Sequence, residues 1–162
     1  MGAREGDLHP LHGDSRYGPP LEKETTVSER PTYTDNNCFV CSQTNPIGLR
    51  IPYRMDGDLC LGEFTPGPNH VGWDDVTHGG ILFSALDDVM ANWLFLQGIH
   101  GHTARCDTRF RKPLRVGTPV IVEGRLLERR GRVARLYGEI RRREDNVVVA
   151  ECEARFVVAR DG

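Results

Sequence analysis

Two glycines and two carboxylates stand within one apolar stretch, where their spacing would allow chemistry. Gly79 and Gly80 follow His78, and Asp87 and Asp88 come nine and ten residues after the histidine. If Gly79 begins a helix, the first backbone amides have no intrahelical acceptor, and the helix dipole adds positive potential there. Such a helix start can polarise a carbonyl group or hold an oxyanion. The two glycines are equally consistent with tight packing of a helix on a strand.

Asp87 is the candidate acid of the stretch. Asp88 has hydrogen-bonding side chains four positions away on both sides, whereas Asp87 has Phe83 four positions before it and Met90 three positions after it. A carboxylate in an apolar site costs several kcal/mol unless a partner or a raised pKa compensates. Asp87 is therefore a candidate general base or nucleophile, with a structural ion pair to an arginine as the alternative. Ser84 has no histidine at hydrolase spacing, which excludes a serine hydrolase.

The element that must position these groups is a helix over residues 79–97. Apolar residues recur at spacings of three and four, and Phe83 and Leu94 extend the apolar surface around nearly the whole circumference. A helix that is apolar on all sides is expected to be buried. Gly98 suits the left-handed cap that ends such a helix.

Alternating apolar and polar residues predict strands on both sides of this helix. Two strands precede it, joined by a hairpin at Asp56-Gly57-Asp58, and residues 66–77 form a loop. Four strands follow, and their short turns require an antiparallel sheet. The predicted strands span residues 49–55, 59–65, 103–113, 118–129, 132–144 and 147–159. The order β-β-α-β-β-β-β predicts an α+β fold, with the sheet curved around one helix. A second subunit would most simply cover the rest of the helix, so we expect at least a homodimer.

Length, charge and composition limit the classes of protein to which this chain can belong. The chain has 162 residues and a net charge of −2, which combines −8 over residues 1–100 with +6 over residues 101–162. Residues 1–36 are polar and predict a tail or arm, and residues 37–162 predict one domain. We see no signal peptide and no apolar run of about 18 residues, so we expect a cytoplasmic protein without a membrane span. The basic residues lack interleaved aromatics, which argues against nucleic-acid binding.

Cys38-Phe39-Val40-Cys41 invites a zinc or redox interpretation. Zinc requires four ligands, and no second pair of this kind or nearby histidine pair follows. The surrounding turn residues also lack the strand–helix setting of a redox motif. The sequence therefore favours two packed cysteines, and the five cysteines together indicate a reducing compartment.

The combination of His78-Gly79-Gly80 with Asp87, on the one long helix of this strand order, resembles the PaaI-like hotdog-fold acyl-CoA thioesterases. The Cys38-Phe39-Val40-Cys41…Asn45-Pro46-Ile47-Gly48-Leu49 lead-in resembles the start of one subset of that superfamily. The resemblance covers residues 37–159. It implies a hotdog fold, in which an antiparallel sheet wraps around one long central helix.

The resemblance also implies a function: hydrolysis of an acyl-CoA thioester by a homodimer or homotetramer, without metal or cofactor. Asp87 matches the catalytic carboxylate, which acts on water or directly on the carbonyl. Gly79 matches the residue whose backbone N–H polarises that carbonyl, and His78 supports the same loop. Thr103, ten residues before Pro113, matches a hydroxyl residue that orients the water from the opposing subunit.

Substrate contacts are expected from three groups of residues. The helix start includes Gly80, and four side chains are candidates for the acyl pocket: Trp73, Phe83, Leu86 and Met90. Four basic residues are candidates for contacts with the CoA phosphates: Arg109, Arg111, Lys112 and Arg115. Certain relatives carry an asparagine six residues before the histidine, where this chain has Gly72, so another group must position the substrate. Asp74 and Asp75 lie nearby and are further candidates.

Three alternatives remain besides a thioesterase. The same fold could bind or sense acyl-CoA without hydrolysing it. A hotdog dehydratase or hydratase pairs a histidine with a carboxylate across a substrate carbon, but His78 is better placed to support the loop. A zinc or redox module on Cys38 and Cys41 is the last alternative.

Overall fold

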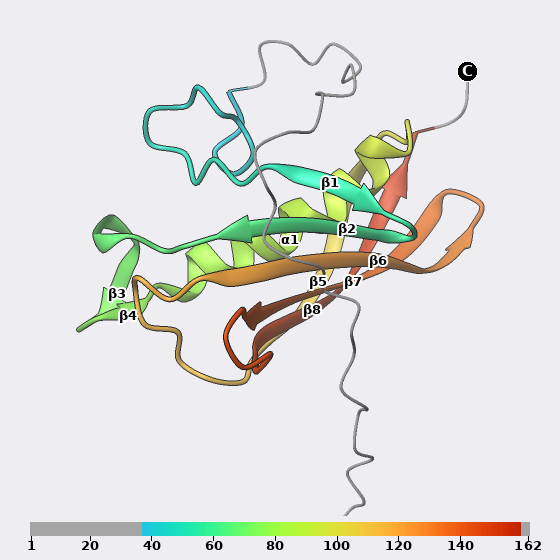
Figure 1. The fold of residues 1–162 in the computed structure, drawn as a ribbon. Coiled ribbons are helices and arrows are strands. Elements are labelled where there is room, and N and C mark those ends of the chain that lie inside the picture. Colours follow the sequence, from blue (N-terminus) through green and yellow to red (C-terminus); the bar gives the residue numbers. More distant parts are fainter. Residues whose placement is uncertain (1–36, 160–162) are drawn as a thin grey trace, which may run out of the picture. The chain divides into compact units, whose positions relative to one another are not determined.

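A six-stranded antiparallel sheet and one long helix make up the computed structural model, which describes residues 37–159. The sheet order is β1-β2-β6-β7-β8-β5, and α1 packs across one face and contacts all six strands (Figure 1). The expected hotdog arrangement is confirmed. The elements in the large sheet and the helix are β1 (Tyr53–Asp56), β2 (Leu59–Phe64), α1 (Gly79–Leu96), β5 (Gly101–Phe110), β6 (Val120–Arg130), β7 (Val133–Arg142) and β8 (Val148–Val158). The expected tail over residues 1–36 lies outside the described residues.

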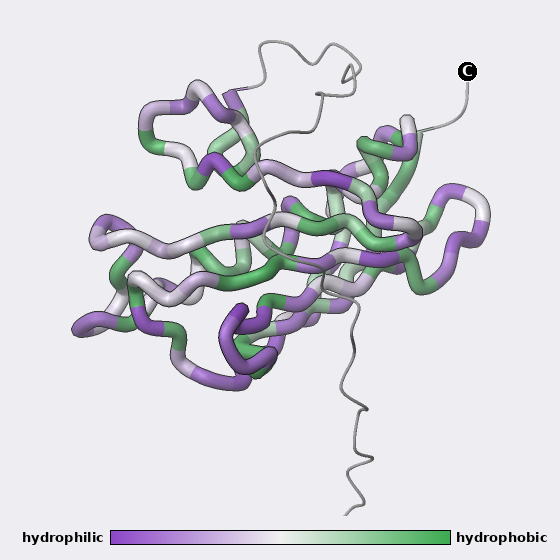
Figure 2. The backbone as a smooth tube through the Cα atoms, in the orientation of Figure 1, coloured by the Kyte–Doolittle hydropathy of each residue, from purple (hydrophilic) through white to green (hydrophobic). Residues whose placement is uncertain are grey.

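Strand alternation sets which side chains face the helix. In β8 the alternate residues Cys152, Ala154 and Phe156 are fully buried, while Glu153 and Arg155 are exposed on the other face. Figure 2 shows the apolar segments along α1 and along the strands, with polar residues at the turns. The core therefore lies between α1 and the inner face of the sheet.

Two parts of the sequence-based assignment are wrong. The first predicted strand begins at Tyr53 and not at residue 49, because Arg50 has a left-handed backbone (φ 56°) and Pro52 has no N–H to donate. The predicted loop over residues 66–77 contains a 3-10 turn, η1 (Pro68–His70), and a hairpin of β3 (Val71–Trp73) and β4 (Val76–Thr77). This hairpin leads directly into α1.

The helix is buried on one face and not on every side. Seven of its 18 residues are buried: Leu82, Ala85, Leu86, Val89, Met90, Trp93 and Leu94. Phe83 remains exposed. The sequence predicted no stretch with the length and apolarity of a membrane span. That prediction is wrong for α1, which is long and apolar enough to cross a membrane by length and composition alone. Its packing against the sheet is that of a core helix.

Candidate functional site

The start of α1 is held by its own capping residue. His78 is the N-cap, and its Nδ1 accepts a hydrogen bond from the backbone N–H of Gly80 at 2.8 Å. The N–H of Gly79 has no acceptor among the described residues. The expected support of the loop by His78 therefore takes the form of a cap, which leaves the Gly79 amide open. The Gly80 amide, expected to contact the substrate, is already occupied by the histidine.

Gly72 allows His78 to take this position. A Cβ added at Gly72 would lie 2.8 Å from the Cα of His78, a distance that real side chains do not tolerate. The asparagine found here in certain relatives would not fit without a backbone shift. The close packing of β3 against the start of α1 thus requires a glycine at position 72, where certain relatives have an asparagine.

Asp87 and Thr103 form the polar pair at the middle of the helix. The Thr103 hydroxyl, on β5, donates to Oδ1 of Asp87 at 2.7 Å. Thr103 lies on the helix-facing side of β5 because it pairs in register with the buried Phe156 of β8. We expected the threonine to come from the opposing subunit; within one chain it bonds to the Asp87 carboxylate of the same copy. Strand β5 runs alongside α1, so two residues that are sixteen positions apart in the sequence come into direct contact.

Asp88 is a half-buried carboxylate that lies against the cysteine turn. Burial raises the pKa of Asp88 to about 6, and hydrogen bonds from the thiols of Cys41 and Cys38 oppose part of this rise. Asn92 donates to its Oδ2 at 3.0 Å, whereas Ser84 bonds to the backbone of Gly80 instead. The Asn92 partner of Asp88 is thus the one expected from the sequence, whereas the expected Ser84 contact is not formed. Adjacent helix residues point about 100° apart, so Asp87 faces β5 while Asp88 faces the cysteine turn.

Gly79 and Asp87 do not converge within one chain. They are eight residues apart on α1, which places them about 12 Å apart along the axis. One thioester carbonyl cannot contact both groups of the same helix. Phe110, at the end of β5, lies beside Gly79 and is 55% exposed, so this end of the helix carries uncovered apolar surface.

The four expected acyl-pocket side chains are not brought together in the described chain. Leu86 and Met90 have no exposed surface, because α1 turns them into the core against the sheet. Trp73 is 77% exposed at the tip of the β3–β4 hairpin, and Phe83 is also exposed. Direct acyl contact by Leu86 and Met90 is therefore not supported, whereas Trp73 and Phe83 remain accessible.

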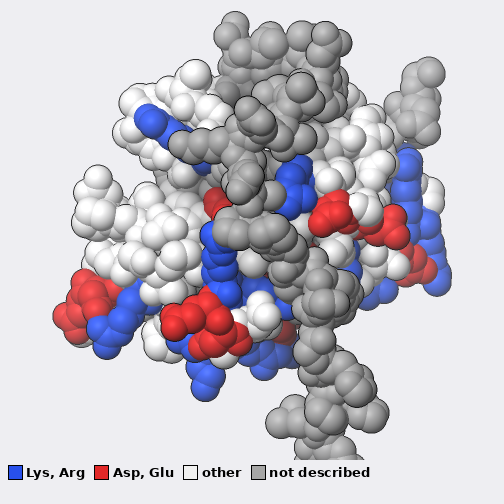
Figure 3. Space-filling view, in the orientation of Figure 1, with Lys and Arg blue, Asp and Glu red and all other residues white. Residues whose placement is uncertain are grey.

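The expected CoA-binding side chains are exposed at the end of β5 and in the following loop. Arg111 pairs with Glu151, and Arg115 pairs with Asp75, whose side chain remains 49% exposed. Lys112 is exposed with no ion pair seen among residues 37–159. Asp74 occupies the hairpin turn with a left-handed φ of 49°. In the view of Figure 3, cationic and anionic side chains lie next to one another across this surface.

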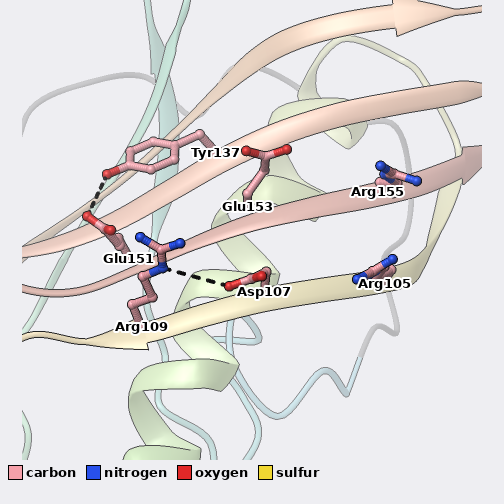
Figure 4. A pocket seen from close by; sticks show the side chains of 7 residues that line it. All are labelled: Arg105, Asp107, Arg109, Tyr137, Glu151, Glu153 and Arg155. Carbon is pink, nitrogen blue, oxygen red and sulfur yellow. Dashed lines mark hydrogen bonds and ion pairs between the residues drawn. The ribbon is translucent and has the colours of Figure 1, made fainter.

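Arg109 points away from the polar pair. It lies 3.9 Å from Asp107 and lines a groove on the outer face of the sheet, where Tyr137 donates to Glu151 (Figure 4). The other residues of this groove are Arg105, Glu153 and Arg155. Basic and acidic side chains alternate there, so the groove presents a solvent-exposed row of alternating charges on the face of the sheet opposite α1.

A cluster that the sequence argument set aside lies beside Asp88. The thiols of Cys38 and Cys41 and the Asp88 carboxylate lie within 4.8 Å of one another. The sequence contains the Cys-x-x-Cys motif, but it does not indicate that this motif contacts a helix residue fifty positions later. This contact required the fold.

The sequence profile of the thioesterase superfamily matches residues 75–149, which span the β3–β4 turn, α1 and the following strands. A solved thioesterase superfamily protein is 27% identical with a TM-score of 0.66, covering 70% of this chain and 58% of that one. This chain therefore resembles the thioesterase superfamily in sequence and the hotdog thioesterases in fold. The PaaI protein of the E. coli phenylacetic acid degradation operon is 21% identical, with a TM-score of 0.63 over 67% of this chain and 83% of that one.

A further hotdog relative was solved with a ligand. A hypothetical thioesterase from Streptococcus pneumoniae with coenzyme A is 14% identical, with a TM-score of 0.63 over 67% of this chain and 85% of that one. None of the curated proteins matches this sequence. At this identity the likeness concerns the fold, and this chain spans under two thirds of the first structure's length.

Proposed function

We propose that this protein hydrolyses acyl-CoA thioesters, with Asp87 as the catalytic carboxylate. The observation that carries the proposal is the contact between Thr103 and Asp87, on the helix face beside the free edge of β5. The hydroxyl occupies one carboxylate oxygen and fixes the orientation of the group. The second oxygen is then available for a water molecule or a thioester carbonyl.

The reaction needs a base and an oxyanion site. As a general base, Asp87 takes a proton from water while the water oxygen attacks the thioester carbonyl carbon. The carbonyl oxygen becomes negative and is stabilised by the open N–H of Gly79. Collapse of this intermediate breaks the carbon–sulfur bond, and the proton held by Asp87 passes to the departing CoA sulfur. In the nucleophilic variant, Asp87 attacks the carbonyl itself, the carbon–sulfur bond breaks and CoA leaves as the thiolate. Water then cleaves the mixed anhydride to the free acid and the Asp87 carboxylate, and its released proton goes to the CoA thiolate.

The amide and the carboxylate of one complete site come from two copies of the chain. Within one chain they lie about 12 Å apart along α1. The outer edge of β5 has no strand partner among the described elements, and Phe83 and Phe110 are exposed beside it. A homodimer formed along this edge would cover both side chains and bring the helix start of one copy toward Asp87 of the other.

The substrate class is supported by the chemistry around the site. Trp73 and Phe83 offer apolar surface for an acyl group, and Arg111, Lys112 and Arg115 offer cations for the phosphates of CoA. The presence of coenzyme A in the Streptococcus pneumoniae relative supports the same ligand class. A hydrophobic pocket discriminates weakly between acyl groups, so aliphatic and aromatic thioesters both belong in the test.

The decisive experiment measures thiol release from a panel of acyl-CoA thioesters by the purified full chain. We expect Asp87→Asn to lower kcat by about 10²–10⁴-fold, because the amide cannot accept the proton of water. Asp56→Asn, a change at an exposed aspartate of β1, is the matched control and should keep the wild-type rate. Circular dichroism checks that all variants are folded.

Two outcomes would contradict the proposal. A folded Asp87→Asn variant with unchanged thiol release would remove Asp87 from the mechanism. Tight binding of acyl-CoA without thiol release from any thioester would favour the non-catalytic sensor. Single-turnover hydrolysis in ¹⁸O-labelled water separates the two mechanisms, because only the nucleophilic route leaves the label in the Asp87 carboxylate.

A further inference from the structure

The cluster of Cys38, Cys41 and Asp88 lies outside the proposed catalytic pair. Each residue offers one donor atom, and the three atoms lie within 4.8 Å of one another. The two cysteines come from the turn before β1, and the aspartate comes from the middle of α1. Two thiols and one carboxylate are a donor set that suits a divalent cation such as zinc.

The turn that carries the cysteines is built around the sulfur of Cys38. The backbone N–H groups of Val40 and Cys41 point at this Sγ, at 3.3 and 3.4 Å. These two contacts fix the position of the sulfur, which is the atom that would bind a metal. Two backbone hydrogen bonds hold this turn in place. The N–H of Leu49 donates to the carbonyl of Phe39 at 2.8 Å, and the N–H of Ile51 donates to that of Val40 at 3.0 Å.

The carboxylate is oriented from its other side. Asn92 donates to Oδ2 of Asp88 at 3.0 Å, which turns Oδ1 toward Cys38 at 3.6 Å from the sulfur. A thiolate and a carboxylate oxygen on one tetrahedral zinc ion lie about 3.5 Å apart, given the usual bond lengths. The 3.6 Å between Cys38 and Asp88 thus matches the spacing of two ligands in such a centre. An amide that holds the ligating carboxylate is also a common feature of metal sites.

A cavity of about 390 Å³ opens beside the three donors. His100, just before β5, and His102, the second residue of β5, line the same cavity. It gives an ion access from solvent to the three donors. The sequence disfavoured zinc because neither a second Cys-x-x-Cys nor a close histidine pair follows, but in the fold two histidines line this cavity.

We propose that Cys38, Cys41 and Asp88 bind a divalent metal ion of zinc type, with the fourth position open to the cavity. The ion would join the lead-in turn to α1 at the residue next to Asp87. This centre is independent of thioester hydrolysis and has its own readout.

The test titrates Co²⁺ into the full-length protein after chelator treatment, in the presence of a non-thiol reductant. We expect one cobalt ion per chain, with a thiolate-to-cobalt charge-transfer band and the visible bands of tetrahedral cobalt, both abolished by Zn²⁺. Cys38→Ser should remove the charge-transfer band or weaken cobalt binding at least tenfold, and Asp88→Asn should shift the visible bands. Cys106→Ser, a change at a half-buried cysteine of β5, is the matched control and should titrate as the wild type does.

Thermal unfolding supplies a second measurement that does not depend on colour. Zn²⁺ should raise the Tm of the wild type and of Cys106→Ser, and leave the Tm of Cys38→Ser unchanged. The proposal is overturned if the wild type gives no charge-transfer band, or if Cys38→Ser retains it. Thiol counting on protein purified without reductant gives the remaining alternative: a disulfide between Cys38 and Cys41 would replace the metal site by a redox pair.

Discussion

At the scale of single residues, the first helical position of α1 is the sharpest feature. Gly79 follows the N-cap, and its N–H has no acceptor among the residues described. His78 has φ −59° and ψ 132°, the extended conformation that a residue before proline adopts. Proline is also tolerated at the first position of a helix. The amide can therefore be removed without disturbing the backbone that carries it.

We predict that Gly79→Pro lowers kcat for thioester hydrolysis by about 10²–10³-fold, the effect of losing one oxyanion donor. The protein should remain folded, as judged by circular dichroism and by its Tm. Steady-state thiol-release kinetics give kcat and KM for the variant.

Gly79→Ala is the matched control, because it keeps the N–H and adds a Cβ at an ordinary contact distance of 3.4 Å from Phe110. Its kcat should stay close to that of the wild type. Equal losses in the alanine and proline variants would mean that the glycine serves packing, which is the alternative that the sequence left open.

At the scale of elements, two paired glycines let the helix approach the sheet. Gly124 of β6 and Gly138 of β7 are cross-strand partners in register. A Cβ on Gly124 would lie 3.1 Å from the carbonyl oxygen of Val89, and one on Gly138 would lie 3.3 Å from that of Leu86. The backbone of α1 therefore rests directly on this pair, at the level of Asp87 and Asp88.

We predict that Gly124→Ala destabilises the protein by about 1–3 kcal/mol, because the new methyl group meets helix backbone that cannot rotate away. Urea unfolding followed by circular dichroism measures the change. Activity should fall as well, since a displaced α1 separates Asp87 from Thr103.

Gly67→Ala provides the comparison for this substitution. A Cβ at Gly67 meets nothing within 4 Å, and the residue has an ordinary negative φ of −97°. Its stability should be unchanged or slightly higher, since alanine restricts the unfolded chain. An equally destabilised Gly67→Ala would show that the loss at Gly124 does not report helix packing.

At the scale of the whole molecule, the proposed site is complete only when two chains meet. One helix cannot present Gly79 and Asp87 to the same carbonyl, and the free edge of β5 lies beside both exposed phenylalanines. Cyclic dimers with two-fold symmetry would form two equivalent sites, each with one amide and one carboxylate from different copies.

We predict that mixing two inactive variants restores activity. If Asp87→Asn and Gly79→Pro chains are unfolded together and refolded, half of the dimers are mixed, and each mixed dimer has one intact site. Thiol release should recover to about a quarter of the wild-type value for random pairing in a two-fold dimer. Light scattering on the same samples distinguishes a dimer from a tetramer.

No recovery, with mixed dimers demonstrated by differently tagged chains, would place both groups of each site in one chain. A monomer that hydrolyses thioesters at the full rate would contradict the shared site as well. Each variant refolded alone provides the baseline.

The sequence alone determined much of the architecture, because apolar periodicity follows directly from secondary structure. The period of residues 79–97 predicted α1, and the alternation in residues 147–159 predicted which side chains of β8 face the core. Glycine and asparagine at Gly57, Gly131 and Asn146 marked turns that adopt left-handed backbone. The His-Gly-Gly motif likewise marked the helix start, since capping is local.

Only the tertiary structure decided how the two aspartates are used. Their one-residue offset directs Asp87 to Thr103 on β5, and Asp88 to the cysteine turn before β1. Both contacts join segments that are distant in the chain, and their existence depends on strand order and register. Local spacing cannot encode such contacts, because the sheet decides which segments meet each face of the helix. For the same reason, the cavity lined by His100 and His102 could not be predicted from the sequence.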